Sequence, residues 1–228
     1  MLTGLCLLMM IRTVCTSSSE RPLLMFLRFP AWLARASLLR AGWVLILSLV
    51  SLLFAACVWA QSDELAALQA RAESGESAAQ FALGARYLHG EGVEADNFEA
   101  LRWLTLAADQ GNANAQYNIA VMYLNGLGVI QDQAEALDWF VKAANNGDRQ
   151  SQFTLGVALF NGQMGAVQNV PEAYKWFTLA GAGGHQSAAA NAVLIQELLP
   201  PAEVARVQDE VRQWIEQFNA RLASSQQP

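Results

Sequence analysis

No cysteine occurs after residue 60, because the three in the chain are Cys6, Cys15 and Cys57. A segment without cysteine can provide neither a disulfide nor a thiol nucleophile. Disulfide scaffolds and cysteine-dependent enzymes are therefore excluded for residues 61–228, even in an oxidising compartment.

Positive charge is also scarce in that segment. Residues 61–228 hold nine Lys and Arg against 19 Asp and Glu, a formal charge of −10, whereas residues 1–60 hold five Arg and one Glu, a formal charge of +4. Phosphate binding needs a basic surface, and an anionic membrane repels an acidic one. Nucleic acid is therefore excluded as a partner, and an anionic membrane surface is disfavoured. Charge complementarity predicts a basic protein partner whose association slows as salt is added.

Groups that carry catalysis are few. The chain has two histidines, His89 and His185, and the sequence gives no reason to bring them together. Residues 61–228 have two lysines, Lys142 and Lys175, and no Ser-x-x-Lys motif, so a serine acyl-transfer enzyme is poorly supported. Glycine-rich Gly-x-Gly turns do occur, but each follows an expected helix rather than a strand and lacks the context of a phosphate loop. We therefore expect no catalytic residue, no metal site and no cofactor.

A long apolar run is missing as well. The run within residues 41–60 is about a dozen residues long, which suits the core of a secretory signal and falls short of the roughly 20 that a spanning helix needs. Val58 and Ala60 supply the small-x-small pattern of a cleavage site. We expect export to the periplasm or envelope, with cleavage after Ala60. Two alternatives stay open: lipidation of Cys57, whose context LFAAC is similar to a bacterial lipobox, and retention of residues 41–60 as an uncleaved anchor. Membrane association is expected only through this segment.

The start of the chain is unusually long for a signal. Initiation at Met1 gives a leader with 40 residues before the apolar run, whereas initiation at Met25 gives an ordinary basic leader. We therefore predict that translation starts at Met25 and that residues 1–24 are not part of the protein made in the cell.

One stretch of sequence is present in three copies. Landmarks in the first two copies are 36 residues apart, as the pairs Gly90 with Gly126 and Trp103 with Trp139 show. Trp139 and Trp176 are 37 apart, so the third copy has one inserted residue, which lies in its loop GQMGAV. A fixed period of this length is typical of stacked supersecondary units.

Each copy predicts a helix, a tight turn and a second helix. The first helices are expected over about 77–89, 113–125 and 149–161, with capping residues Asn112 and Asp148 and a weaker cap, Glu76. The Gly-x-Gly-Val turn allows the positive φ that folds one helix back on the other. Each second helix begins with an acidic or amide residue followed three residues later by glutamate, which resembles a capping box. These pairs are Asp96 with Glu99, Asp132 with Glu135, and Asn169 with Glu172.

Large apolar residues and alanines repeat at helical spacing and predict one buried stripe. Leu83, Tyr87, Ala100, Trp103, Ala107 and Ala108 recur as Ile119, Tyr123, Ala136, Trp139, Ala143 and Ala144.

The motifs Leu-Gly-x-x-Tyr, Gly-x-Gly-Val, Ala-x-x-Trp and Ala-Ala together resemble the Sel-one-like repeat (SLR), a relative of the tetratricopeptide repeat, over about 77–186. The resemblance implies an all-α protein, an α-solenoid of helix-turn-helix repeats wound as a right-handed superhelix. An amphipathic helix beyond Pro201 is expected to act as the C-terminal capping helix. The expected ranges are a leader at 1–60, a partial leading helix at 61–76, SLR repeats at 77–112, 113–148 and 149–185, capping helices at 186–222 and a disordered tail at 223–228.

The third repeat departs from the pattern. Leu159 replaces the tyrosine, Gly181 replaces the second alanine, and the loop carries the extra residue. We expect a looser unit there, either through drift in a terminal repeat or because the loop is shaped for a partner.

Solenoids of this class present the first helix of each repeat on an inner concave surface. Asparagine offers a donor and an acceptor to a peptide backbone, and methionine adapts to irregular apolar surfaces. The candidate partner-binding residues on this surface are Arg86, His89, Asn118, Met122, Asn125, Thr154 and Asn161.

The resemblance thus implies a non-enzymatic scaffold or adaptor in the bacterial cell envelope that binds a protein partner. One alternative is a cell-wall or β-lactam-reactive enzyme, although the paired cysteines of the SLR proteins linked to β-lactams are missing here. The other is a self-assembling structural factor of the envelope.

Overall fold

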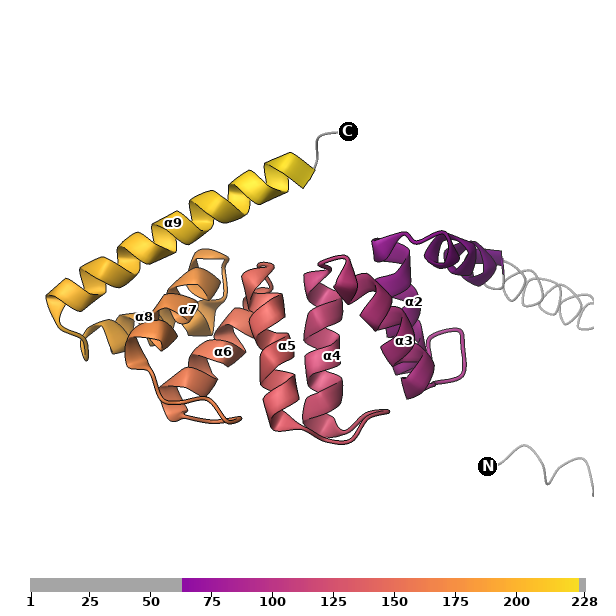
Figure 1. Ribbon diagram of the computed structural model, residues 1–228, viewed down its shortest axis with the longest axis horizontal. Helices are drawn as coiled ribbons and strands as arrows, with labels where there is room; N and C mark the ends of the chain where they lie inside the picture. The colour runs from indigo at the N-terminus through magenta and orange to yellow at the C-terminus, as the bar shows by residue number, and fades with distance from the viewer. Residues whose placement is uncertain (1–62, 226–228) are drawn as a thin grey trace, which may run out of the picture. The chain divides into compact units, whose positions relative to one another are not determined.

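The structure is a computed structural model that describes residues 63–225. In it, successive helices pack as antiparallel pairs (Figure 1). All of these residues lie in the second of the chain's two compact units, Ala55–Pro228. A helix at 63–73 comes first, and no strand occurs in the described part. The other helices are α2 (Ser77–His89), α3 (Asn97–Asp109), α4 (Ala113–Asn125), α5 (Gln133–Asn145), α6 (Arg149–Asn161), α7 (Val170–Ala182), α8 (Gln186–Gln196) and α9 (Pro201–Ser225).

The paired helices α2–α3, α4–α5 and α6–α7 pack closely within each repeat, and each repeat packs on the next, which is the arrangement of an all-α repeat solenoid. The predicted fold class is therefore confirmed. The predicted leader, with Cys57 and the cleavage site after Ala60, lies outside the described residues. Within 63–225, none of the helices combines the length and apolar character needed to cross a bilayer.

The turns inside the repeats use their capping residues differently from the expected capping box. The Asp96 carboxylate accepts the backbone N–H groups of Phe98 and Glu99 at 2.8 and 3.1 Å, as an N-cap should. The second half of the box is absent, because Glu99 pairs with Arg102 instead. The N–H of Asp96 donates across the turn to the carbonyl of Tyr87 at 3.0 Å, so the preceding helix supplies the acceptor.

The same cross-turn bond recurs in the other two repeats. The N–H of Asp132 donates to the carbonyl of Tyr123 at 3.0 Å, and that of Asn169 to the carbonyl of Leu159 at 2.9 Å. Since only the backbone of residues 87, 123 and 159 takes part, leucine can replace tyrosine there without loss of the bond.

Glycine brings the α4–α5 turn close to the preceding repeat. Gly126 and Gly128 both have φ of 70°, in the left-handed region that glycine adopts without strain. A Cβ on Gly128 would lie 2.8 Å from the Cβ of Asn97 and 2.9 Å from its carbonyl oxygen. The α4–α5 turn is therefore pressed against the start of α3, and only glycine fits at this contact.

Neighbouring repeats are also joined by a row of buried glutamines that the sequence analysis did not identify. Gln116 donates to the carbonyl of Ala108 in the previous repeat at 3.0 Å and accepts from the side chain of Asn146 at 2.9 Å. Gln80, 36 residues earlier, donates to the carbonyl of Ala72 at 3.2 Å and accepts from Gln110 at 2.7 Å. Helix 63–73 therefore supplies a carbonyl acceptor to α2 in the same way that α3 supplies one to α4.

The third glutamine of this row, Gln152, is only 2% exposed and donates to the carbonyl of Ala144 at 3.1 Å. Gly183 occupies the position that Asn146 holds one repeat earlier, so no side chain is present there to donate to Gln152. The row therefore ends with a single hydrogen bond.

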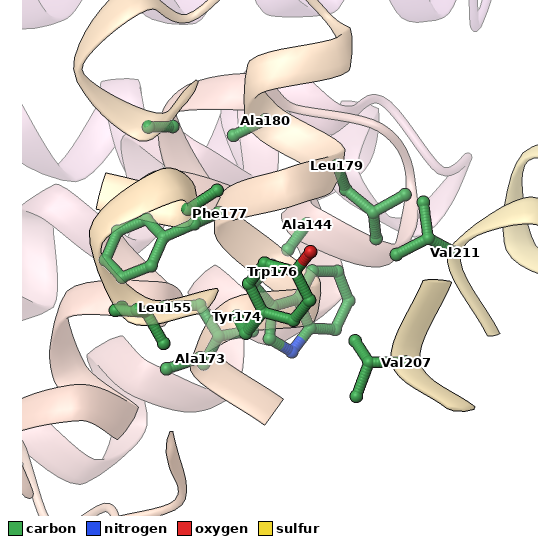
Figure 2. Packing of buried hydrophobic residues seen from close by; sticks show 13 residues of the cluster. Ala144, Leu155, Ala173, Tyr174, Trp176, Phe177, Leu179, Ala180, Val207 and Val211 are labelled. Carbon is green, nitrogen blue, oxygen red and sulfur yellow. The ribbon is translucent and has the colours of Figure 1, made fainter. Parts of the chain in front are cut away.

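The third repeat is closely packed, contrary to the expectation of a looser unit. Its core is the cluster in Figure 2, in which Val207 and Val211 point from α9 toward Trp176 and Leu179 of α7. A Cβ on Gly181 would lie 2.9 Å from the Cα of Ala189, so glycine at this position lets α8 approach α7 closely. The departure at Gly181 is thus a packing feature.

The extra loop residue also has a packing role. Met164 adopts φ of 57° and its side chain packs against Ala120, Ala136 and Phe140 of the second repeat. The loop of the third repeat therefore reaches back to its neighbour, as the α4–α5 turn does.

The C-terminal helix is longer than expected. We predicted a disordered tail from residue 223, but α9 continues to Ser225. Arg221 donates to the carbonyl of Asn145 at 3.1 Å, and the Phe218 ring lies against Gly147, so the last turns of α9 are held by the α5–α6 turn.

Candidate functional site

A groove lies where α6, α7 and α8 meet. Its volume is about 310 Å³, within the range of pockets that hold a small ligand or a side chain. Apolar side chains dominate its lining, and two asparagines supply the polar groups. The lining residues are Val157, Phe160, Asn161, Phe177, Asn191, Leu194, Ile195 and Leu198.

The other side of the groove comes from one stripe of α8 and the turn after it. Asn191, Leu194 and Ile195 of α8, together with Leu198 in the turn that follows Gln196, keep the i, i+3, i+4, i+7 spacing of a single helical face. Ile195 is buried against α7, whereas Leu194 and Leu198 are 63% and 66% exposed. The groove therefore has a buried floor and an open apolar side.

The exposure of these leucines follows from the path of the chain. A complete repeat would place a second helix against α8, but Pro200 and Pro201 end that run and α9 starts at Pro201. The core contacts of α9 run through Val207 and Val211 to α7. Among the helices within residues 63–225, none covers the side of α8 that carries Leu194, and the neighbouring Leu198 is likewise exposed.

The part of the groove on α6 is fixed by the end of that helix. Phe160 and Asn161 form its last residues, and Gly162 follows with φ of 67° and its N–H on the carbonyl of Ala158. This left-handed cap ends α6 at Asn161 and keeps its side chain at the groove.

Of the seven residues predicted for partner binding, the structure places one in this groove, Asn161. His89, Asn125 and Asn161 are exposed, and each is the last residue of a first helix, α2, α4 or α6. A polar residue therefore recurs at this repeat position, but only Asn161 lines the groove. Asn125 turns back to donate to the carbonyl of Val121 at 2.9 Å.

Asn118 and Thr154 are half-buried, and Thr154 donates to the carbonyl of Gln150 at 2.9 Å within its own helix. Arg86 is paired with Glu64 of helix 63–73. Among the described residues these side chains make local contacts and do not converge on one site.

Met122 is a wrong prediction, because its side chain is completely buried. Together with Ile119 it packs in one cluster with Leu104 of α3, the second helix of the preceding repeat. Ala158, 36 residues later, is buried as well, and Arg86 holds the same position in the first repeat. This position faces the preceding helix pair, and in the first repeat Arg86 uses it to pair with Glu64 of helix 63–73.

The remaining ionisable groups do not form a chemical centre. Within residues 63–225, no three His, Cys, Asp or Glu side chains come together as they would around a metal ion. His185 is the N-cap of α8: its Nδ1 accepts the N–H of Ala188 at 3.2 Å, which leaves Nε2 to donate to Gln150 at 3.3 Å. Its ring stacks on Phe153 at 4.4 Å between centroids, so this histidine has a structural role.

Displaced pKa values occur in exposed ion pairs away from the groove. The hydrogen bond from Arg71 lowers the pKa of Glu76 and raises that of Arg71. The bond from Arg206 likewise lowers the pKa of Glu203. Exposed pairs of this kind contribute little to stability. The groove itself is lined by no ionisable side chain, so its contacts are apolar and amide in character.

Three stacked helix pairs and an open apolar groove without an ionisable lining residue are typical of helical-repeat proteins that mediate protein–protein interaction. The Sel1 repeat model matches residues 77–112, 113–148 and 149–185. The chain belongs to the Sel1 repeat (SLR) family, whose members are generally non-catalytic scaffolds.

Two solved structures support this assignment. A Sel1 repeat protein from Oxalobacter formigenes is 36% identical, with a TM-score of 0.53, over 57% of this chain and 96% of that chain. The protein c5321, a protective antigen present in uropathogenic Escherichia coli strains that displays an SLR fold, is 41% identical, with a TM-score of 0.51, over 54% of this chain and 26% of that chain. No curated protein matches the chain.

Proposed function

We propose that this protein is an exported, non-enzymatic scaffold of the bacterial cell envelope that binds a protein partner on the face formed by the first helices of its repeats. The groove between α6 and α8 is the observation that carries this proposal. It combines exposed apolar side chains with amides on its lining, which is the composition expected of a peptide-binding groove rather than of a catalytic site.

An extended segment of the partner fits this chemistry. An apolar side chain of the segment would bury itself between Phe160 and Leu194, which removes apolar surface of both proteins from water. Asn161 and Asn191 each offer a donor and an acceptor, so they satisfy the peptide groups that flank the buried side chain. The groove would then select its partner by an apolar anchor and its backbone.

Capture of the partner from intact cells tests this assignment. The protein is tagged after residue 228, crosslinked in the cells that produce it and compared with the variant Leu194→Glu. A buried charge in the groove is costly, so we expect recovery of the dominant partner to fall at least about tenfold. Val193→Glu is the matched control, because Val193 is 62% exposed on the same helix and does not line the groove. Equal recovery with both variants would contradict the proposal.

Export rests on the leader sequence, and the mass of the mature protein tests it. Cleavage after Ala60 predicts a mature chain that starts at Gln61 and contains no cysteine. Intact-mass measurement of the protein recovered from cells should therefore give the mass of residues 61–228. The mass would instead identify lipidation if the product starts at Cys57 and carries a lipid. It would identify an uncleaved anchor if the product keeps residues 41–60.

A further inference from the structure

Exposed apolar side chains also gather on a second surface, along the turns inside the repeats. Ile130 in the α4–α5 turn is 90% exposed, and Val167 at the equivalent place in the α6–α7 turn is 85% exposed. Phe98, in the first turn of α3, is 74% exposed. Single exposed apolar residues are ordinary on protein surfaces, but a group of them that lines one concavity marks an interaction site.

Two of these side chains line one open groove of about 760 Å³, with Phe98 contributed by the first repeat and Ile130 by the second. The groove is also lined by Gly126 and by Asn97 and Gly128, which lie close to each other. In Figure 1 the α4–α5 and α6–α7 turns lie along the lower edge of the repeats, away from α9. The groove shares no residue with the one between α6 and α8.

The charge along this edge has one sign. Residues 90–99, 126–135 and 162–172, the turns with the starts of the second helices, contain seven Asp and Glu and no Lys or Arg. Glu99 and Glu172 are paired with Arg102 and Lys175 of their own helices. The other five carboxylates have no ion pair among the described residues; they are Glu91, Glu94, Asp96, Asp132 and Glu135.

We propose that this turn edge is a second docking surface, which holds a cationic, amphipathic polypeptide segment of a partner protein. Apolar side chains of the segment fill the groove between Phe98 and Ile130, and its Lys or Arg side chains lie over Glu91, Glu94 and Asp96. The Asp96 Oδ1 atom already accepts two backbone N–H groups, and no described residue donates to its Oδ2 atom, which leaves that atom for a cation. Burial of the apolar side chains supplies affinity, and the carboxylates supply orientation and salt dependence.

Titration with a defined peptide tests this surface. The probe is a fluorescein-labelled 12-residue peptide in which lysine and leucine alternate, so that an extended chain carries one basic and one apolar face. We expect saturable binding to the purified protein that weakens as salt rises. Two control peptides should not bind: one with glutamate in place of lysine, and one with serine in place of leucine. Binding of the serine peptide as tight as that of the probe would overturn the apolar half of the proposal.

Protein variants locate the binding. The double variant Phe98→Ala/Ile130→Ala should weaken the peptide's Kd at least about tenfold, whereas Leu106→Ala/Val193→Ala, at exposed positions elsewhere, should not. Glu91→Gln/Glu94→Gln should weaken binding severalfold at low salt and flatten its salt dependence, with Glu197→Gln/Glu216→Gln as the charge-matched control.

Four results would overturn the proposal. The first is absence of saturable binding, and the second is equal binding by the groove variant and its control. The third is a dimer, seen by light scattering, that dissociates in Phe98→Ala/Ile130→Ala, because this would assign the edge to a second copy of the chain. The fourth is loss of binding in Leu194→Glu but not in Phe98→Ala/Ile130→Ala, because this would place the peptide in the α6–α8 groove.

Discussion

Replacing Phe177 by alanine should lower the free energy of unfolding by about 4 kcal/mol, the usual cost of removing a buried phenylalanine. Phe177 is 2% exposed and belongs to the cluster that joins α6, α7, α8 and α9 (Figure 2). Its ring fits against Gly156, where a Cβ would lie 2.9 Å away, and tilts against Phe153 at 5.7 Å between centroids. Urea unfolding followed by circular dichroism measures the loss.

Phe98→Ala is the matched control for this variant, because Phe98 is an exposed residue of the same type on the equivalent helix of the first repeat. It should change the free energy of unfolding by less than about 0.5 kcal/mol. Similar losses for the two variants would mean that the cluster around Phe177 does not hold the C-terminal helices together.

Replacing Gln116 by methionine should lower the free energy of unfolding by about 2 kcal/mol, and replacing Gln152 by methionine should cost about half as much. The side chains have similar length and similar helix propensity, so the change removes hydrogen bonds and little else. Gln116 loses two side-chain bonds, to Ala108 and from Asn146, whereas Gln152 loses the one to Ala144.

The difference between these two variants is the informative quantity, since both residues are nearly fully buried and 36 residues apart in the repeat. Gln213→Met on the exposed side of α9 controls for the substitution itself. Equal losses at positions 116 and 152 would contradict the account in which the third repeat lacks the second bond because Gly183 has no side chain.

The helices and their order could be predicted from the sequence because local chemistry determines them. The caps Asp96, Asp132 and Asn169 accept backbone N–H groups as expected, and the turn glycines adopt positive φ. The reciprocal half of the capping box could not be predicted, since it depends on a competitor: a carbonyl of the preceding helix takes the N–H that glutamate would have taken.

Contacts between repeats were harder to predict than contacts within them. Met122 lies on a helix whose surface mixes polar and apolar residues, and only its packing against the preceding repeat decides that it is buried. The buried glutamines were missed for the same reason, although their 36-residue spacing at Gln80, Gln116 and Gln152 was present in the sequence as a signal.

The candidate groove was predicted only in part. Asn161 was selected as an asparagine on the concave face of a first helix, but its neighbours Asn191 and Leu194 lie in the segment interpreted as a cap. The helical spacing of Asn191, Leu194 and Leu198 indicates a face. That this face stays open depends on the path of α9, which packs on α7. Composition alone does not determine that path.

Photo-crosslinking from inside the groove in intact cells tests the central claim most directly. A photoreactive amino acid is placed at position 194, in the groove, or at position 106, exposed on α3 and outside it. We predict one dominant protein adduct from position 194, identified by mass spectrometry, and none of the same protein from position 106. No adduct from position 194, or the same adduct at equal yield from position 106, would contradict the claim that this protein is a scaffold that binds its partner in the groove between α6 and α8.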